Sequence, residues 1–164
     1  MRTVTTHTVY YKFHELDKLA QERAVAKLAN LNVDDWDWWH WVYESANAIG
    51  VSITSFELDR HLHAKGQFTQ SPLAVINAIK AAHVPDNPMH RVACQVEIAF
   101  LTANCETTRE DITEKFLKTL LGLYATALQE EWDYLTSKEA VIDTIRANDY
   151  EFNKYGHLMG STPT

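Results

Sequence analysis

Apolar residues in this chain change from an alternating pattern to a helical one and back again. Residues 3–13 alternate imperfectly and are rich in Thr, Val and Tyr, which predicts a strand. Residues 51–58 and 62–69 flank a short polar segment and predict a β-hairpin. A short closing strand is expected at 150–152, and residues 160–164 are expected to be a disordered tail.

Between these segments, apolar residues recur every three or four positions, as they do on one face of a helix. Asp17, Ser71 and Ser137 stand where helix N-caps are expected, and Pro72 follows Ser71 in the first turn. The predicted helices cover residues 17–31, 34–49, 71–82, 89–104, 108–134 and 138–148. Helices grouped between a few strands indicate an α+β fold with a small antiparallel sheet made of the N-terminal strand, the central hairpin and the C-terminal strand. We expect a single compact domain over residues 1–159.

Residues 36–43 hold four of the five tryptophans in the chain. In a helix that begins at Asp34 and ends at Gly50, one set of residues follows the spacing of a buried face: Trp36, Trp39, Val42, Tyr43, Ala46 and Ile49. Trp38 and Trp41 would form a second aromatic edge that points elsewhere. The cluster is therefore either part of the core or a prepared binding surface.

The charge is acidic, with 15 Lys and Arg against 22 Asp and Glu, a net charge of −7. This balance argues against direct nucleic-acid binding, which depends on basic side chains at phosphates. Residues 34–59 carry six acidic side chains and no Lys or Arg. If Trp38 and Trp41 are exposed, the neighbouring carboxylates complete a candidate partner-binding site: Trp38, Trp41, Asp34, Asp35 and Asp37. Solubility alone also explains a moderate negative charge.

Candidate chemistry is sparse. Asp59, His61 and His63 alternate along the predicted hairpin and carry groups that bind zinc or other first-row metals, although polar residues at a turn need no metal. Phosphate-binding, nucleophile-elbow and zinc-protease motifs do not occur in the sequence, so we expect neither a cofactor nor enzymatic activity. Cys94 and Cys105 are expected to be reduced and structural. The sequence shows no membrane-spanning or signal segment, and we expect a cytoplasmic protein.

Several short motifs, in their order along the chain, resemble a family of uncharacterised proteins from tailed phages and prophages, some labelled as antitoxins of a toxin–antitoxin stability system. The motifs are Tyr11–Leu16, Trp38-Trp39, Val42–Glu44, Phe56–Arg60, Gly66–Thr69, Glu130–Thr136 and Ala147–Phe152. They span most of the chain apart from residues 84–106. The antitoxin label implies binding to a partner protein and supplies no catalytic residues.

Together, the residues and the resemblance predict a phage-borne protein that binds a host protein without catalysis, as an antitoxin or a counter-defence inhibitor. Two alternatives remain. The first is an acidic mimic of nucleic acid that blocks a host DNA- or RNA-binding enzyme, whose binding would depend strongly on salt. The second is a small metal-dependent enzyme centred on Asp59, His61 and His63.

Overall fold

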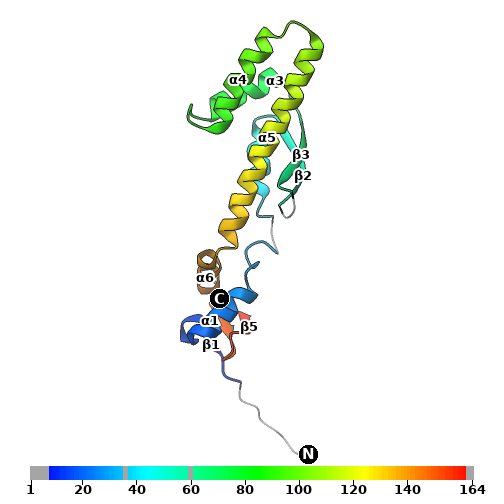
Figure 1. The fold of residues 1–164 in the computed structure, drawn as a ribbon. Coiled ribbons are helices and arrows are strands. Elements are labelled where there is room, and N and C mark those ends of the chain that lie inside the picture. Colours follow the sequence, from blue (N-terminus) through cyan, green and yellow to red (C-terminus); the bar gives the residue numbers. More distant parts are fainter. Residues whose placement is uncertain (1–7, 35–36, 59–60, 162–164) are drawn as a thin grey trace, which may run out of the picture. The chain divides into compact units, whose positions relative to one another are not determined.

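The computed structural model describes residues 8–34, 37–58 and 61–161 and confirms the α+β class (Figure 1). The chain divides into two compact units. Unit 1 comprises Met1–Trp38 and Trp132–Thr164, and unit 2 comprises Trp39–Glu131. The strands form two separate antiparallel sheets, whereas the sequence predicted one, because the terminal strands pair in unit 1 and the hairpin pairs in unit 2.

Unit 1 is built from both ends of the described chain. Its elements are β1 (Tyr11–Lys12), η1 (Phe13–Glu15), α1 (Lys18–Lys27), α6 (Lys138–Ala147), β4 (Tyr150–Phe152) and β5 (Leu158–Ser161). The sheet order is β1-β4-β5, with Tyr11 opposite Phe152. The predicted caps are confirmed: Asp17 Oδ1 accepts the Ala20 N–H at 2.8 Å, and Ser137 Oγ accepts the Ala140 N–H at 3.2 Å.

The core of unit 1 lies between its two helices and the central strand β4. Its buried members are Phe13, Leu16, Ala20, Ala24, Val141, Ile145 and Phe152. The rings of Phe13 and Phe152 meet edge-on with centroids 6.2 Å apart. Strand β1 is much shorter than predicted within the described residues because residues 8–10 are not part of the ladder, which pairs only Tyr11 and Lys12 with β4. Strand β5 was not predicted, and it includes Gly160 and Ser161 of the expected disordered tail; residues 162–164 lie outside the described residues.

Unit 2 contains the helices α2 (His40–Ala48), α3 (Pro72–Ala82), α4 (Pro88–Thr102) and most of α5 (Glu106–Leu135), with the hairpin strands β2 (Val51–Glu57) and β3 (His63–Phe68). The hairpin confirms the predicted one, and Gly50 ends α2 at φ +85° as expected. The hairpin packs on α5, where Phe68 and Phe116 have ring centroids 5.5 Å apart. A salt bridge of 2.8 Å joins Lys80 of α3 to Glu97 of α4.

Helix α2 begins at His40, about two turns later than predicted from Asp34. The preceding residues form turns, in which the Asp34 N–H donates to the Asn30 carbonyl at 3.0 Å. The buried Asn32 side chain donates to the Leu135 carbonyl at 2.9 Å, and Trp38 is buried within unit 1. Residues 31–34 and 37–39 are therefore not part of a helix in the described structure.

Candidate functional site

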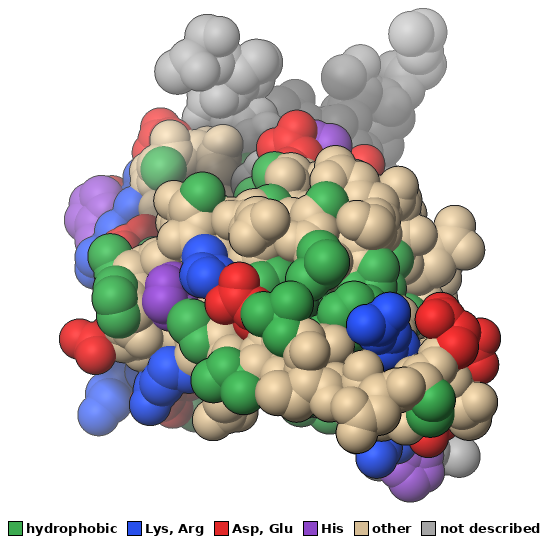
Figure 2. Space-filling model, turned by 90° about the horizontal axis from the view of Figure 1, so that it is seen from above, with side chains coloured by type: hydrophobic (Ala, Val, Ile, Leu, Met, Phe, Trp, Pro, Cys, Tyr) green, Lys and Arg blue, Asp and Glu red, His purple; other side chains and the backbone are tan. Residues whose placement is uncertain are grey.

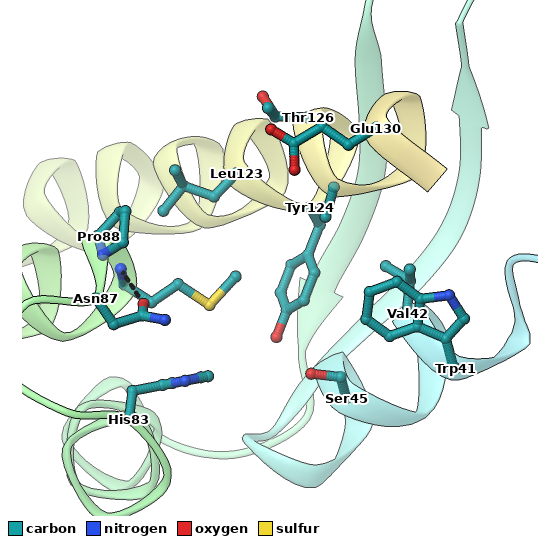
Figure 3. Close-up of a pocket in the computed structure, with 12 residues that line it drawn as sticks. Trp41, Val42, Ser45, His83, Asn87, Pro88, Leu123, Tyr124, Thr126 and Glu130 are labelled. Atoms are coloured by element: carbon teal, nitrogen blue, oxygen red, sulfur yellow. Dashed lines mark hydrogen bonds between the residues drawn. The ribbon is translucent and has the colours of Figure 1, made fainter. Parts of the chain in front are cut away.

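A cavity of about 340 Å³ opens within unit 2 beside Trp41 (Figure 3). Its walls come from α2, from the segment between α3 and α4, and from α5. The lining residues are Trp41, Val42, Ser45, His83, Asn87, Pro88, Met89, Leu123, Tyr124, Thr126, Ala127 and Glu130. This volume is near the lower end of ligand-binding cavities.

Local sequence features place these side chains. Trp41 and Ser45 are four residues apart on α2 and therefore share a face of that helix. Helix α3 ends at His83, whose backbone is extended. Asn87 then caps α4 by accepting the Met89 N–H at its Oδ1, 2.8 Å away, and Pro88 occupies the first turn. The segment between α3 and α4 thus forms one wall of the cavity.

Two polar atoms inside the cavity have no hydrogen-bond partner among the described residues: Tyr124 Oη and His83 Nε2. Tyr124 is only 2% exposed, and its ring points from α5 toward the space between His83 and Ser45 (Figure 3). Burial raises the pKa of the Tyr124 phenol to about 12, while the Ser45 hydroxyl nearby opposes that shift. Buried polar groups in native proteins are nearly always hydrogen-bonded, so these two atoms are candidates to bond a group that enters the cavity.

The rim of the cavity is half-exposed and carries a negative charge. Trp41 is 49% exposed. Among the described residues that line the cavity, Glu130 is the only Asp, Glu, Lys or Arg, and it is exposed. On the same helix as Trp41, the exposed His40 and Glu44 form a pair, with Nε2 and Oε1 3.1 Å apart.

The structure separates the two tryptophans that the sequence placed at one binding surface. Trp38 is 5% exposed and lies in unit 1, where its ring packs against Trp132. The expectation that Trp38 is an exposed anchor is therefore wrong, because its ring is buried against Trp132. Trp41 is exposed as expected and belongs to unit 2. On the predicted buried face, Val42, Ala46 and Ile49 are buried, while Trp39 and Tyr43 contact Phe56 of β2; Trp36 lies outside the described residues.

The predicted acidic residues do not join the cavity. Asp34 and Asp37 are exposed and belong to unit 1, whereas the cavity belongs to unit 2. Asp35 lies outside the described residues. Of the four predicted partner-binding residues that the structure describes, Trp41 is the one that lines this cavity.

The predicted metal ligands are described only in part. Asp59 lies outside the described residues, and His61 is exposed. His63 Nδ1 lies 2.7 Å from the His61 carbonyl oxygen, an interaction that requires the proton on Nδ1. The described part of the chain contains no group of three His, Cys, Asp or Glu that could hold a metal ion.

Sequence reasoning missed Tyr124, His83 and Ser45. Tyr124 stands in the apolar stripe of α5 among Leu120, Leu121 and Leu128, so its spacing predicts an ordinary core residue. The one available signal is chemical, because a phenol in a stripe of leucines carries a hydroxyl that needs a partner. His83 directly follows the helix predicted over residues 71–82, and only the fold brings it into the same cavity as Tyr124.

A second surface of unit 2 also carries many apolar side chains. Seen from the α3 and α4 end, hydrophobic side chains gather among single basic and acidic ones (Figure 2). Ile98 and Leu101, three residues apart on α4, are among the most exposed large hydrophobic residues that the structure describes. The unpartnered buried polar atoms of the described residues lie beside Trp41 and not on this surface.

No protein-family model, curated protein or solved structure matches this chain. The cavity must therefore be interpreted from its own chemistry. Among the helices that the structure describes, none has the length and hydrophobicity needed to cross a membrane.

Proposed function

We propose that this protein acts by non-catalytic binding of a partner protein, which contacts Trp41 and fills the cavity beside it. The observation that carries the proposal is a half-exposed tryptophan at the mouth of an apolar cavity that contains two unpartnered buried polar atoms. Tryptophans of this kind, next to a pocket that becomes desolvated, dominate the binding energy of many protein interfaces.

The polar groups of the cavity support binding more than catalysis. A nucleophilic serine needs a base within hydrogen-bond reach. His83 Nε2 has no hydrogen-bond partner among the described residues, so it does not activate Ser45 in this structure. The Tyr124 phenol is neutral at pH 7, as an ordinary phenol is, and burial raises its pKa further, to about 12. A neutral phenol of this kind binds and orients a partner group.

In this proposal the partner is a host protein in the cytoplasm of a bacterium, and the role is antitoxin-like or counter-defence; the phage resemblance of the sequence motifs supports this setting. The exposed carboxylates of Glu44 and Glu130 near Trp41 would orient a partner with a basic surface. The resemblance supplies the biological setting, and the cavity supplies the contact surface.

An affinity pull-down from bacterial lysate tests the proposal, with wild type beside Trp41→Ala and Tyr134→Ala. Tyr134 is an exposed aromatic residue outside the cavity and serves as the control. We expect a specific protein that wild type and the Tyr134 variant retain and the folded Trp41 variant loses, with affinity reduced by about 2 kcal/mol or more. Equal retention by all three proteins would contradict the proposed site. Binding that disappears with salt and ignores Trp41 would instead favour the nucleic-acid mimic.

A further inference from the structure

We infer that the cavity beside Trp41 receives one arginine side chain of the partner protein. The inference rests on the proposed function and names the group that the cavity recognises. Four polar side chains of the cavity can accept hydrogen bonds from a guanidinium: Glu130, Tyr124, Ser45 and His83. His83 accepts at Nε2 when its proton is on Nδ1.

The charge of the lining distinguishes a cation from an anion. Among the described lining residues there is no Lys or Arg, and Glu130 carries the single formal charge. A carboxylate or phosphate would find no charged donor and would lie near a like charge. A cation would find the Glu130 carboxylate and two buried atoms, Tyr124 Oη and His83 Nε2, that have no partner in the described structure.

The walls suit the apolar stem and flat head of arginine. Leu123 and Met89 offer apolar surface for a methylene chain, and the rings of Trp41 and Tyr124 line the same cavity (Figure 3). A guanidinium stacks on aromatic faces and presents five donors in a plane. The acceptors come from different parts of the unit, with the exposed Glu130 beside Thr126 and the Tyr124 hydroxyl facing His83 and Ser45 (Figure 3). The long side chain of arginine carries five donors, whereas the ammonium of lysine is compact, so arginine offers donors to more of these groups.

Three capped pentapeptides test the inference: acetyl-Ala-Ala-Xaa-Ala-Ala-amide, in which Xaa is arginine, citrulline or lysine. Citrulline has nearly the shape of arginine without its charge. Each peptide is titrated into the full chain and followed by NMR at the Trp41 indole N–H, assigned by comparison with Trp41→Phe. We expect the arginine peptide to bind at least about tenfold more tightly than the citrulline peptide, and lysine to be intermediate.

Two variants locate the effect. Glu130→Gln should weaken the arginine peptide by about tenfold and leave the citrulline peptide nearly unchanged. Tyr124→Phe should weaken the arginine peptide while keeping the cavity walls. Glu114→Gln, an exposed residue on the same helix outside this cavity, should change neither affinity.

Equal affinity for arginine and citrulline, or no shift of the Trp41 signal at millimolar arginine peptide, would overturn the inference. So would unchanged arginine binding in Glu130→Gln. A partner that depends on Trp41 but not on Glu130 or Tyr124 would overturn the inference and leave the proposed function intact. The absence of any Trp41-dependent partner in the pull-down would instead reject the proposed function, even if the arginine peptide binds.

Discussion

Trp38 packs edge-on against Trp132, with ring centroids 5.5 Å apart and ring planes at 62°. The two residues are far apart in sequence and belong to the same compact unit. This contact makes Trp38 a structural residue, while its near neighbour Trp41 remains half-exposed beside a cavity. Within one short aromatic segment, two tryptophans therefore have different roles.

Replacing each tryptophan by alanine should affect the free energy of unfolding differently. Trp38→Ala removes a buried ring and is expected to lower the free energy of unfolding by about 3–5 kcal/mol. Trp41→Ala should change it by less than about 1 kcal/mol, because half of that side chain already contacts water. Urea denaturation followed by circular dichroism gives both values. Similar losses for the two variants would show that Trp41 is also a core residue.

Tyr124→Phe should stabilise the unbound protein. The Tyr124 hydroxyl is buried without a partner among the described residues, and the variant removes it while keeping the ring. We expect an increase of about 1 kcal/mol in the free energy of unfolding. Tyr134→Phe, at an exposed position, provides the control and should have no effect. A loss of stability in Tyr124→Phe would mean that the hydroxyl is already satisfied, for example by water.

Stability should fall in alkaline solution between about pH 10 and 12. Burial raises the pKa of Tyr124 from 10.0 to about 12 in the folded protein. Above pH 10 the unfolded chain releases this proton first, so its contribution is complete below pH 10 and is lost as the pH rises through 12. The loss amounts to about 2–3 kcal/mol.

Denaturation curves at several alkaline pH values, with Tyr124→Phe as the reference, isolate this effect from other titrating groups. His83 and Glu130 line the same cavity and are present in both proteins, so the comparison cancels their contribution. The Phe variant should lack the additional loss. A parallel pH dependence of the two proteins would contradict the assignment to Tyr124.

Two glycines should respond in opposite directions to alanine. Gly122→Ala introduces a Cβ with no atom within 4 Å in the middle of α5, and should stabilise the protein by about 0.5–1 kcal/mol. Gly66→Ala places a Cβ 2.3 Å from the Ser52 carbonyl oxygen in the hairpin and should destabilise it by about 1–3 kcal/mol. Thermal or urea denaturation measures both. A stabilising Gly66→Ala would show that the hairpin can widen at this point.

Local signals in the sequence were sufficient for most elements. Asp17, Ser71 and Ser137 each cap the helix that they were expected to begin, because capping depends on residues within one turn. Strand β5 was missed because its residues, Leu158–Ser161, become a strand by pairing with β4 and have no strong pattern of their own. The start of α2 was misplaced because the Asn32 and Trp38 contacts are long-range.

The candidate site was only partly predictable for the same reason. Trp41 could be identified because aromatic density is visible in the sequence. Tyr124, His83 and Ser45 come from three parts of the chain, α5, the residue after α3, and α2, and these parts line one cavity only in the folded unit. Periodicity could assign Tyr124 to a buried face, but it could not show that its hydroxyl would be left without a partner.

The division of the chain also sets an order of events on the ribosome. Unit 2 is one uninterrupted stretch, Trp39–Glu131, whereas unit 1 needs the pairing of Tyr11 in β1 with Phe152 in β4. The nascent chain therefore exposes the apolar side chains of Phe13 and Leu16 until the last strands leave the exit tunnel. During this interval the middle of the sequence, Trp39–Glu131, can already form a complete unit, whereas Phe13 and Leu16 can bury their side chains only after α6 and β4 have been synthesised.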